Sequence, residues 1–138
     1  MSNENRTLFI VKPDAVERHL IGGILAHVEE AGFHLIAGRY TTLQKAECET
    51  FYAEHKERPF FGELVTYMTS GPVFLTALEG EGGPLRLREV IGATDPAEAA
   101  EGTVRKRFGL DKGRNSVHAS DSVPSAAREI KLFFGNEL

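Results

Sequence analysis

The sequence predicts an α/β sandwich, in which helices alternate with the strands of one sheet and cover it. Two observations support this fold class: short apolar runs with strand character recur along the chain, and the segments between them place apolar residues at helical spacing. Glycine and proline mark most of the boundaries. With 138 residues and 41% hydrophobic content, the chain can fill one hydrophobic core, but two domains of half this length would each bury too little apolar surface. We therefore expect one domain over residues 1–138.

The amino-terminal part predicts a strand, a helix and a second strand. The run Thr-Leu-Phe-Ile-Val at 7–11 is apolar and rich in strand formers, and a Lys-Pro-Asp turn ends it. Apolar residues from Ile21 to Val28 then recur at helical spacing, and Gly32 is a fitting C-terminal stop. Alternating apolar residues predict the next strand at 33–40.

The central part predicts two helices and a buried strand. A polar helix is expected at 44–55, and Pro59 prevents it from continuing. A further helix at 60–68 ends near a Ser-Gly-Pro turn, and the run Val-Phe-Leu-Thr-Ala-Leu at 73–78 predicts a third strand. The glycines of segment 79–83 indicate a surface turn.

The carboxy-terminal part predicts a long irregular stretch between two helices. Proline in the first turn favours a helix at 84–91. Residues 92–113 are too rich in Gly, Ala, Thr and charge for long elements, and a loop of that length in a compact domain is usually functional or disordered. A short strand at 116–119 and a capped helix at 122–134 complete the order β, α, β, α, α, β, α, β, α.

Composition limits the class of protein. The net charge of −4 and the isoelectric point near 5.7 argue against a chain whose main task is to coat nucleic acid. Cys48 is the only cysteine, so no internal disulfide can form, and the first residues lack the pattern of a secretory signal. No apolar run approaches the roughly 18 residues of a membrane-spanning helix. We expect a soluble protein of the cytoplasm that does not enter membranes.

The strongest chemical signal is the segment Asn-Ser-Val-His-Ala-Ser-Asp-Ser at 115–122. His118 is followed at once by hydroxyls, a carboxylate and a helix start, which makes its imidazole a candidate nucleophile. A cluster of cations precedes it in an otherwise acidic chain, and such clusters bind phosphates. A nucleophilic histidine beside phosphate-binding residues indicates phosphoryl transfer. The clustered cations are Arg105, Lys106, Arg107, Lys112 and Arg114.

Six ordered motifs extend along the chain. They are Val11-Lys12-Pro13-Asp14, Tyr52-x-Glu54-His55 with Arg58-Pro59-Phe60-Phe61, Ser70-Gly71-Pro72-Val73, Gly92-Ala93-Thr94-Asp95-Pro96, Gly102-Thr103-Val104-Arg105 and Asn115-x-Val117-His118-x-Ser120-Asp121-Ser122. With these motifs the chain resembles the nucleoside diphosphate kinases over essentially its whole length. The resemblance implies a ferredoxin-like βαββαβ sandwich with a four-stranded antiparallel sheet, which the linear pattern alone does not distinguish from a parallel one.

The resemblance also implies a reaction. The γ-phosphoryl group of a nucleoside triphosphate would pass to a nucleoside diphosphate by a ping-pong route through a phosphohistidine at His118, with broad base and sugar tolerance. Lys12 and Arg105 would contact the phosphate that moves, while Arg88 and Thr94 hold the inner phosphates. Tyr52 would form a hydrogen bond in the phosphate region.

Further roles follow from the same resemblance. Asn115, together with Lys12, would bind the ribose hydroxyls, and Phe60 would stack on the base, which tolerates any base because each has a π-face. Ser120 and Glu129 would orient the imidazole. Mg²⁺ would enter with the nucleotide, bound through its phosphates rather than in a protein cage. Family members assemble through dimers, so we expect a homo-oligomer, either a hexamer or a tetramer.

The chain departs from the family pattern at Ala119, where glycine is usual, and at Lys106, Arg107 and Lys112. An alternative function is a nucleic-acid-binding or regulatory module on the same sandwich, with the basic 105–114 segment as its contact; the overall acidity makes nucleic acid an unlikely partner. A second alternative is a histidine phosphocarrier or phosphatase, which would pass the phosphate to a protein or to water. No Walker-type loop is present, so the phosphate site is not of the P-loop type.

Overall fold

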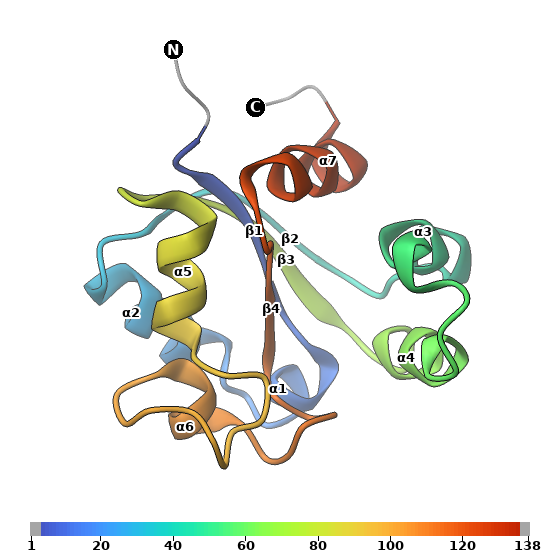
Figure 1. Cartoon of the computed structure of the whole chain (residues 1–138), viewed down its shortest axis with the longest axis horizontal. Coiled ribbons are helices and arrows are strands. Elements are labelled where there is room, and N and C mark those ends of the chain that lie inside the picture. Colours follow the sequence, from blue (N-terminus) through green and yellow to red (C-terminus); the bar gives the residue numbers. More distant parts are fainter. Residues whose placement is uncertain (1–3, 136–138) are drawn as a thin grey trace.

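The computed structural model describes residues 4–135. Its strands are β1 (Arg6–Val11), β2 (His34–Thr41), β3 (Val73–Glu79) and β4 (Val117–Ala119), and its helices are α1 (Pro13–Glu17), α2 (Ile21–Glu30), α3 (Lys45–Phe51), the 3₁₀ turn η1 (Ala53–His55), α4 (Phe61–Met68), α5 (Gly83–Ile91), α6 (Val104–Phe108) and α7 (Val123–Phe134). The strands form one antiparallel sheet in the order β2-β3-β1-β4, with helices on both faces (Figure 1). This architecture confirms the predicted α+β sandwich and its antiparallel sheet.

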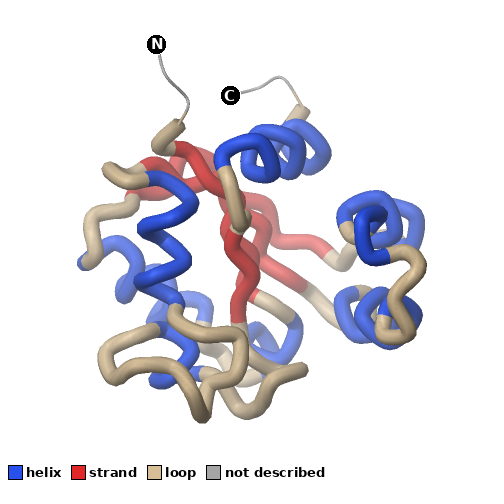
Figure 2. The backbone as a smooth tube through the Cα atoms, viewed as in Figure 1, coloured by secondary structure: helices blue, strands red, loops and turns tan. Residues whose placement is uncertain are grey.

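The central strand β1 separates two cores. Its side chains alternate between the faces of the sheet, and all of those from Leu8 to Val11 are fully buried. Leu8 and Ile10 pack in a core with residues of α3, α4 and α7. Phe9 and Val11 pack in the opposite core with residues of α1, α2, α5 and α6. Figure 2 shows the resulting layers, with helices on either side of the strands.

Helix α7 carries a buried polar residue into the apolar layer. Its start is capped by the Ser122 hydroxyl, which accepts a hydrogen bond of 3.2 Å from the backbone N–H of Ser125. Ala126, Ile130 and Phe133 are buried in the core, and Glu129 is buried beside them. None of the helices in residues 4–135 combines the length and apolar character needed to cross a membrane.

Two short helices were not predicted. Helix α1 follows β1 directly, where the sequence indicated only a turn, and α6 lies inside the 92–113 stretch, where no element was assigned. Both are five residues long, too short for helical periodicity to show in the sequence. The Thr103 hydroxyl starts α6 by accepting a hydrogen bond of 3.3 Å from the N–H of Lys106. The predicted 44–55 helix divides, because α3 ends at Phe51 and η1 follows as a separate turn.

Strand β2 lies at an edge of the sheet and, within residues 4–135, pairs only with β3. The register shifts between Leu35 and Ala37, so the predicted alternation of buried and exposed residues does not persist along the strand. Leu35 is 42% exposed and Tyr40 is 62% exposed. The edge therefore presents apolar side chains together with its unpaired backbone groups.

Candidate active site

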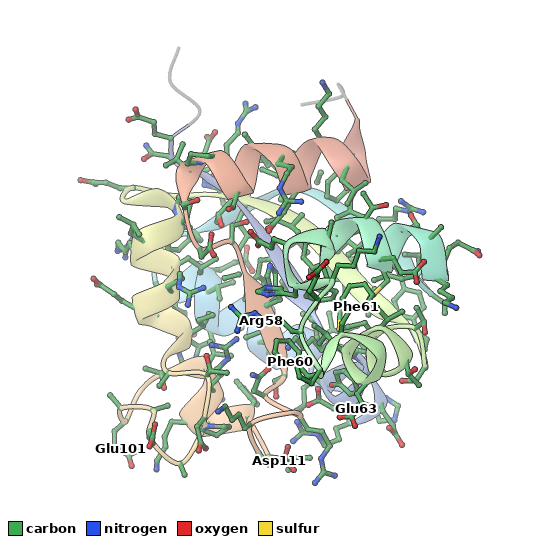
Figure 3. The ribbon with its side chains drawn as sticks, turned by 45° about the vertical axis from the view of Figure 1, so that its right-hand side comes forward. Arg58, Phe60, Phe61, Glu63, Glu101 and Asp111 are labelled. Carbon is green, nitrogen blue, oxygen red and sulfur yellow. The ribbon has the colours of Figure 1, made fainter. Side chains whose placement is uncertain are left out.

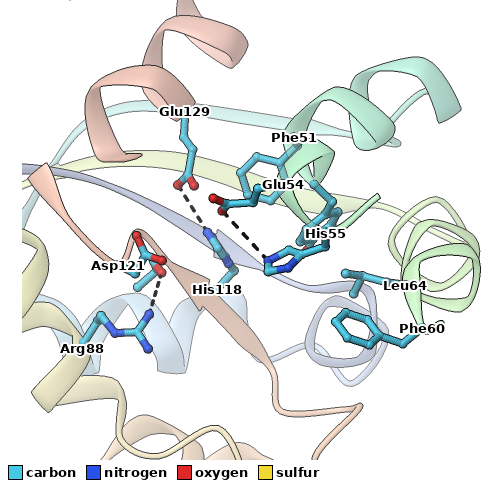
Figure 4. Close-up of a pocket in the computed structure, with 11 residues that line it drawn as sticks. Phe51, Glu54, His55, Phe60, Leu64, Arg88, His118, Asp121 and Glu129 are labelled. Carbon is cyan, nitrogen blue, oxygen red and sulfur yellow. Dashed lines mark hydrogen bonds and ion pairs between the residues drawn. The ribbon is translucent and has the colours of Figure 1, made fainter. Parts of the chain in front are cut away.

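His118 lies in the middle of β4, an edge strand of three residues that pairs with β1. The register sets His118 opposite Ile10, and the neighbours Val117 and Ala119 are buried. The His118 side chain retains 23% of its exposure and points into a pocket on the α7 side of the sheet (Figure 4). The ring of Phe51 packs edge-on against the imidazole, with centroids 4.9 Å apart. This edge strand thus carries its histidine into a partly sheltered cavity.

One carboxylate holds the imidazole. Nε2 of His118 lies 3.4 Å from Oε1 of Glu129, and the hydroxyl of Ser120 donates a hydrogen bond of 2.7 Å to the same oxygen. The Ser120 hydroxyl also accepts a hydrogen bond from the backbone N–H of Leu8, at 3.2 Å, which fixes it to β1. Glu129 is 4% exposed and Ser120 is fully buried. The carboxylate is therefore positioned by the strand and the helix together.

The surroundings of His118 favour the neutral imidazole. Burial lowers the pKa of His118, and the positive charges of Lys12 and Arg105 lower it further, while Glu129 opposes both effects. The net direction is below the ordinary value of 6.5. At pH 7 the ring is therefore uncharged and keeps a lone pair available.

The pocket has a volume of about 190 Å³ and opens between α7, β4 and the helical hairpin of α3 and α4. One wall is largely aromatic and the other carries charge. Phe60 lies at the start of α4 near the mouth and is 46% exposed (Figures 3 and 4). Tyr52 lies at the end of α3 and is 7% exposed. The lining residues are Phe51, Tyr52, Glu54, His55, Phe60, Leu64, Arg88, His118, Ala119, Asp121 and Glu129.

Lys12 is buried immediately after β1. It is 8% exposed, and its Nζ donates a hydrogen bond of 3.0 Å to Oδ1 of Asn115. Burial lowers its pKa to about 8, the charge of Arg105 acts in the same direction, and Asp14 opposes them. The side-chain amide of Asn115 donates in turn to the carbonyls of Thr94 and Lys112, at 3.2 and 3.1 Å. Asn115 thus connects the lysine to two loops.

Arg105 is held rigidly by backbone carbonyls. It is 6% exposed, and its two terminal nitrogens donate to the carbonyls of Gly92 and Val117, at 3.1 and 2.9 Å. Its Nε is buried without a hydrogen-bond partner in the described part of the chain. Burial, with the charge of Arg88, lowers its pKa to about 10. A buried guanidinium with donors to spare is suited to bind an anion.

The structure divides the predicted site residues into two adjoining groups. Tyr52, Phe60, Arg88, His118 and Glu129 line the pocket, with Ser120 directly behind Glu129. The second group lies beside the first and comprises Lys12, Arg105, Asn115 and Thr94. Arg88 donates to the carbonyl of Ala119 at 3.4 Å, and it lies close enough to Arg105 of the second group for its charge to lower the pKa of that guanidinium. Thr94 is exposed and reaches the site through its carbonyl.

The remaining cations of the basic segment are exposed to solvent. Lys106, Arg107, Lys112 and Arg114 are all exposed, and Arg114 is paired with Asp111 at 2.6 Å. Four further residues near the pocket have no role in the prediction from sequence. They are His55, Glu54, Asp121 and Arg128, the last of which lies 3.6 Å from Oε2 of Glu129 and 3.9 Å from Glu54. Glu54, His55 and Asp121 stand inside the sequence motifs, which was the available signal.

The charges around His118 suit an anion. Residues 4–135 contain no group of three or more histidine, cysteine or acidic side chains that could hold a metal ion. The buried charges nearest His118 are instead the cations Lys12 and Arg105 and the carboxylate Glu129. A divalent cation fits here only if a bound phosphate chain supplies most of its ligands.

Fold and site together define a class: an α+β enzyme with a sheltered histidine beside buried cations. The sequence model described as "Nucleoside diphosphate kinase" matches residues 5–138. A protein of that name from Desulfatibacillum aliphaticivorans is 56% identical over 129 residues, with 94% of each chain covered, and one from Paracoccus denitrificans is 58% identical, covering 94% of this chain and 92% of the relative. The chain belongs to the nucleoside diphosphate kinase family.

Solved structures agree. A crystal form of the Aquifex aeolicus nucleoside diphosphate kinase superposes with a TM-score of 0.93 at 47% identity, with 96% of each chain covered. The enzyme from Encephalitozoon cuniculi superposes with the same score at 38% identity, covering 96% of this chain and 90% of that one. The protein is therefore a phosphotransferase that acts on nucleotides, and the alternative of a nucleic-acid-binding or regulatory module is not favoured.

Proposed function

We propose that His118 carries the γ-phosphoryl group between the two nucleotides and accepts it on Nδ1. The observation behind this assignment is the contact of 3.4 Å between Nε2 and Glu129. It fixes the tautomer that has the proton on Nε2, and it leaves Nδ1 without a hydrogen-bond partner in the described part of the chain. The lone pair of Nδ1 attacks the γ-phosphorus, the bond to the bridging oxygen breaks, and the nucleoside diphosphate leaves with that electron pair.

The second half-reaction reverses the first. An oxygen of the acceptor diphosphate attacks the phosphorus of the phosphohistidine, and the bond to Nδ1 breaks, which restores the neutral ring. In the intermediate the imidazole bears positive charge, and the carboxylate of Glu129 stabilises it. Ser120 keeps the carboxylate in place by its hydrogen bond of 2.7 Å.

The cations hold the phosphate chain. Lys12 and Arg105 are buried beside His118 and are the candidates to contact the phosphate that moves. Arg88 and Thr94 are the candidates for the inner phosphates, and Tyr52 donates in the phosphate region. Asn115, which already accepts from Lys12, would bind the ribose together with that lysine, and Phe60 at the pocket mouth would stack on the base.

Mg²⁺ is proposed as the cofactor. The absence of a three-ligand protein cluster in residues 4–135 supports an ion that arrives with the nucleotide and is bound by its phosphates. Such an ion would neutralise phosphate charge, and the residues that would retain the complex are the cations Lys12, Arg88 and Arg105.

We propose that residues 1–138 act as one domain in a cytoplasmic homo-oligomer built from dimers, a hexamer or a tetramer. The free edge of β2 supports the assembly, because exposed strand edges with apolar side chains are usually covered in native proteins. The single, fully buried Cys48 is compatible with a reducing compartment.

The proposed function is tested by following the two phosphoryl transfers separately, first from ATP to the protein and then from the protein to GDP. Incubation with labelled ATP and Mg²⁺, followed by gel filtration, should give an acid-labile phosphoprotein, and added GDP should remove the label as GTP. His118→Ala should remain unlabelled. Label that leaves only as inorganic phosphate would favour a phosphatase instead.

A further inference from the structure

A partly buried polar cluster lies behind the proposed phosphate site and takes no part in the reaction described above. The carboxylate of Asp14 accepts hydrogen bonds from Arg18, at 3.0 Å, and from the hydroxyl of Tyr67. The same Nη2 of Arg18 donates to the carbonyl of Phe108 at 2.8 Å and to the hydroxyl of Ser116 at 3.1 Å. Three stretches of the chain, at residues 14–18, 67 and 108–116, meet at these two charged side chains.

Ser116 has a backbone conformation that serine rarely adopts. Its φ is +77°, in the left-handed region, and the residue is completely buried. Its hydroxyl donates to the carbonyl of Phe108 at 3.0 Å and lies 3.5 Å from the carboxylate of Asp14. A strained conformation of this kind persists only where the surroundings hold it, and Arg18 and Asp14 are the charged groups that do so here.

The conformation of Ser116 matters because its neighbours belong to the site. The carbonyl of Ser116 accepts a hydrogen bond of 2.9 Å from the backbone N–H of Lys12. Asn115, immediately before it, receives the hydrogen bond from Nζ of Lys12, and β4 begins immediately after it. If Ser116 relaxed to an ordinary conformation, Asn115 would turn away from Lys12 and the entry to the His118 strand would shift.

We propose that Asp14 and Arg18 are positioning residues of the transfer reaction, which hold Ser116 in its left-handed conformation and so keep Lys12 and Asn115 together at the phosphate site. The inference rests on the proposed roles of Lys12 and Asn115 in nucleotide binding. Asp14 has a second effect, because its negative charge opposes the loss of the proton from Lys12 and raises the pKa of that amine. The other groups that face Lys12 are Arg105, His118 and Asn115.

The first experiment uses glycine as a rescue. Arg18→Gln should lower kcat/KM about tenfold, since a left-handed residue other than glycine then loses its support. Ser116→Gly alone should stay within about twofold of wild type, because glycine adopts a positive φ without strain. The double variant Arg18→Gln with Ser116→Gly should recover most of the loss. Equal kcat/KM in the single and double variants would overturn the proposal.

The second experiment uses the pH profile. Lys12 must be protonated to bind phosphate, so kcat/KM of the free enzyme falls as the pH rises through its pKa of about 8. Asp14→Asn keeps the shape of the side chain but removes its negative charge, which raises the pKa of Lys12 in wild type. The alkaline limb of the kcat/KM profile should therefore move to lower pH in this variant. Tyr67→Phe is the matched control, because it removes a partner of Asp14 without changing its charge, and it should lower the melting temperature but leave the limb in place. A limb that does not move in Asp14→Asn would contradict the inference.

Both experiments are read at a temperature where thermal unfolding shows each variant folded. Arg18→Lys serves if Arg18→Gln fails to fold, since lysine keeps the charge but lacks the second donor nitrogen, Nε, which donates to the carbonyl of Asp14 at 3.1 Å. Wild type that forms no phosphoenzyme contradicts the proposed function itself. Active wild type with unaltered variants contradicts only the role given to Asp14 and Arg18.

Discussion

Nε2 of His118 lies 3.4 Å from Oε1 of Glu129, and a single oxygen of that buried carboxylate receives both the imidazole and the Ser120 hydroxyl. Glu129 comes from helix α7 and His118 from the edge strand β4, so the contact depends on the packing of α7 against the sheet. A nucleophile that must gain and lose a phosphoryl group in every cycle needs a fixed tautomer and a partner for its transient positive charge, and one carboxylate supplies both.

Glu129→Gln should lower kcat with little change in KM. Glutamine keeps the size of the side chain but cannot neutralise the charge on the phosphorylated ring, and the loss of one charge-assisted hydrogen bond is about 1.5–3 kcal/mol, or tenfold to about a hundredfold in rate. Glu49→Gln, an exposed change on α3, is the control and should leave kcat unchanged. Steady-state kinetics with ATP and GDP decide; a rise in KM alone would assign Glu129 to substrate binding.

Arg105→Ala should lower kcat/KM about tenfold to a hundredfold. The variant loses a charge-assisted contact to the transferred phosphate, which is worth about 1.5–3 kcal/mol of transition-state stabilisation. The pH profile should change as well. The charge of Arg105 lowers the pKa of both Lys12 and His118, so its removal raises both, and the acid limb that reports neutral His118 should move to higher pH. Arg114→Ala, an exposed change in the same basic segment, should have no such effect. Identical pH profiles of kcat/KM for wild type and Arg105→Ala would show that Arg105 does not act at the site.

Lys12→Met should stabilise the fold at pH 7 while it abolishes transfer. The pKa of Lys12 falls from 10.5 to about 8 on folding, so the buried ammonium costs about 3 kcal/mol at neutral pH. Since the unfolded chain binds more protons than the folded one between pH 8 and 10.5, wild-type stability should rise with pH over that window. We expect a net gain of about 1–2 kcal/mol for Lys12→Met, because Asn115 loses its partner.

The measurement for Lys12 is urea unfolding of both proteins between pH 7 and pH 10. The difference in the free energy of unfolding should shrink as the pH rises, because deprotonation removes the cost from wild type. A methionine variant that is less stable than wild type at pH 7 would show that the buried charge is compensated by its surroundings.

Phe60→Ala should raise KM for every nucleotide by a similar factor and leave kcat nearly unchanged. Stacking on an aromatic ring is worth about 1–3 kcal/mol per base and does not depend on which base it is. The ring is 46% exposed, so the melting temperature should hardly change. Leu85→Ala, an exposed apolar residue of α5 that does not line the pocket, is the control. A KM effect confined to purines would indicate a contact more selective than stacking.

Much of the fold follows from local patterns in the sequence. The apolar run of β1 is a strong local signal, and the structure forms a strand there as predicted; the helical spacing of Ala126, Ile130 and Phe133 places all three in the core. The antiparallel sheet is a matter of long-range pairing, such as Phe9 with Thr76 and with Ala119, and no local pattern encodes it; the family resemblance supplied it. The five-residue helices α1 and α6 are fixed by the turn and cap chemistry of Pro13 and Thr103 rather than by periodicity.

The site was predicted less completely than the fold. The motifs identified the residues, but not that Lys12 loses most of its exposure or that an oxygen of Glu129 is shared by two donors. These features arise where α7 and the 92–115 loops pack around the end of β1. The supporting pair Asp14 and Arg18 was missed because its partner, Ser116, is about a hundred residues away in sequence.

The central claim is that Nδ1 of His118 carries the phosphoryl group while Nε2 keeps its proton toward Glu129. Phosphorus and nitrogen NMR of the phosphoenzyme, prepared with ATP and Mg²⁺ from ¹⁵N-histidine-labelled protein, tests it most directly. We predict phosphorus coupled to Nδ1 of one histidine, absent in His118→Ala, with the signal lost when GDP is added. Phosphorus coupled to Nε2, or a phosphorylated residue other than His118, would contradict the account.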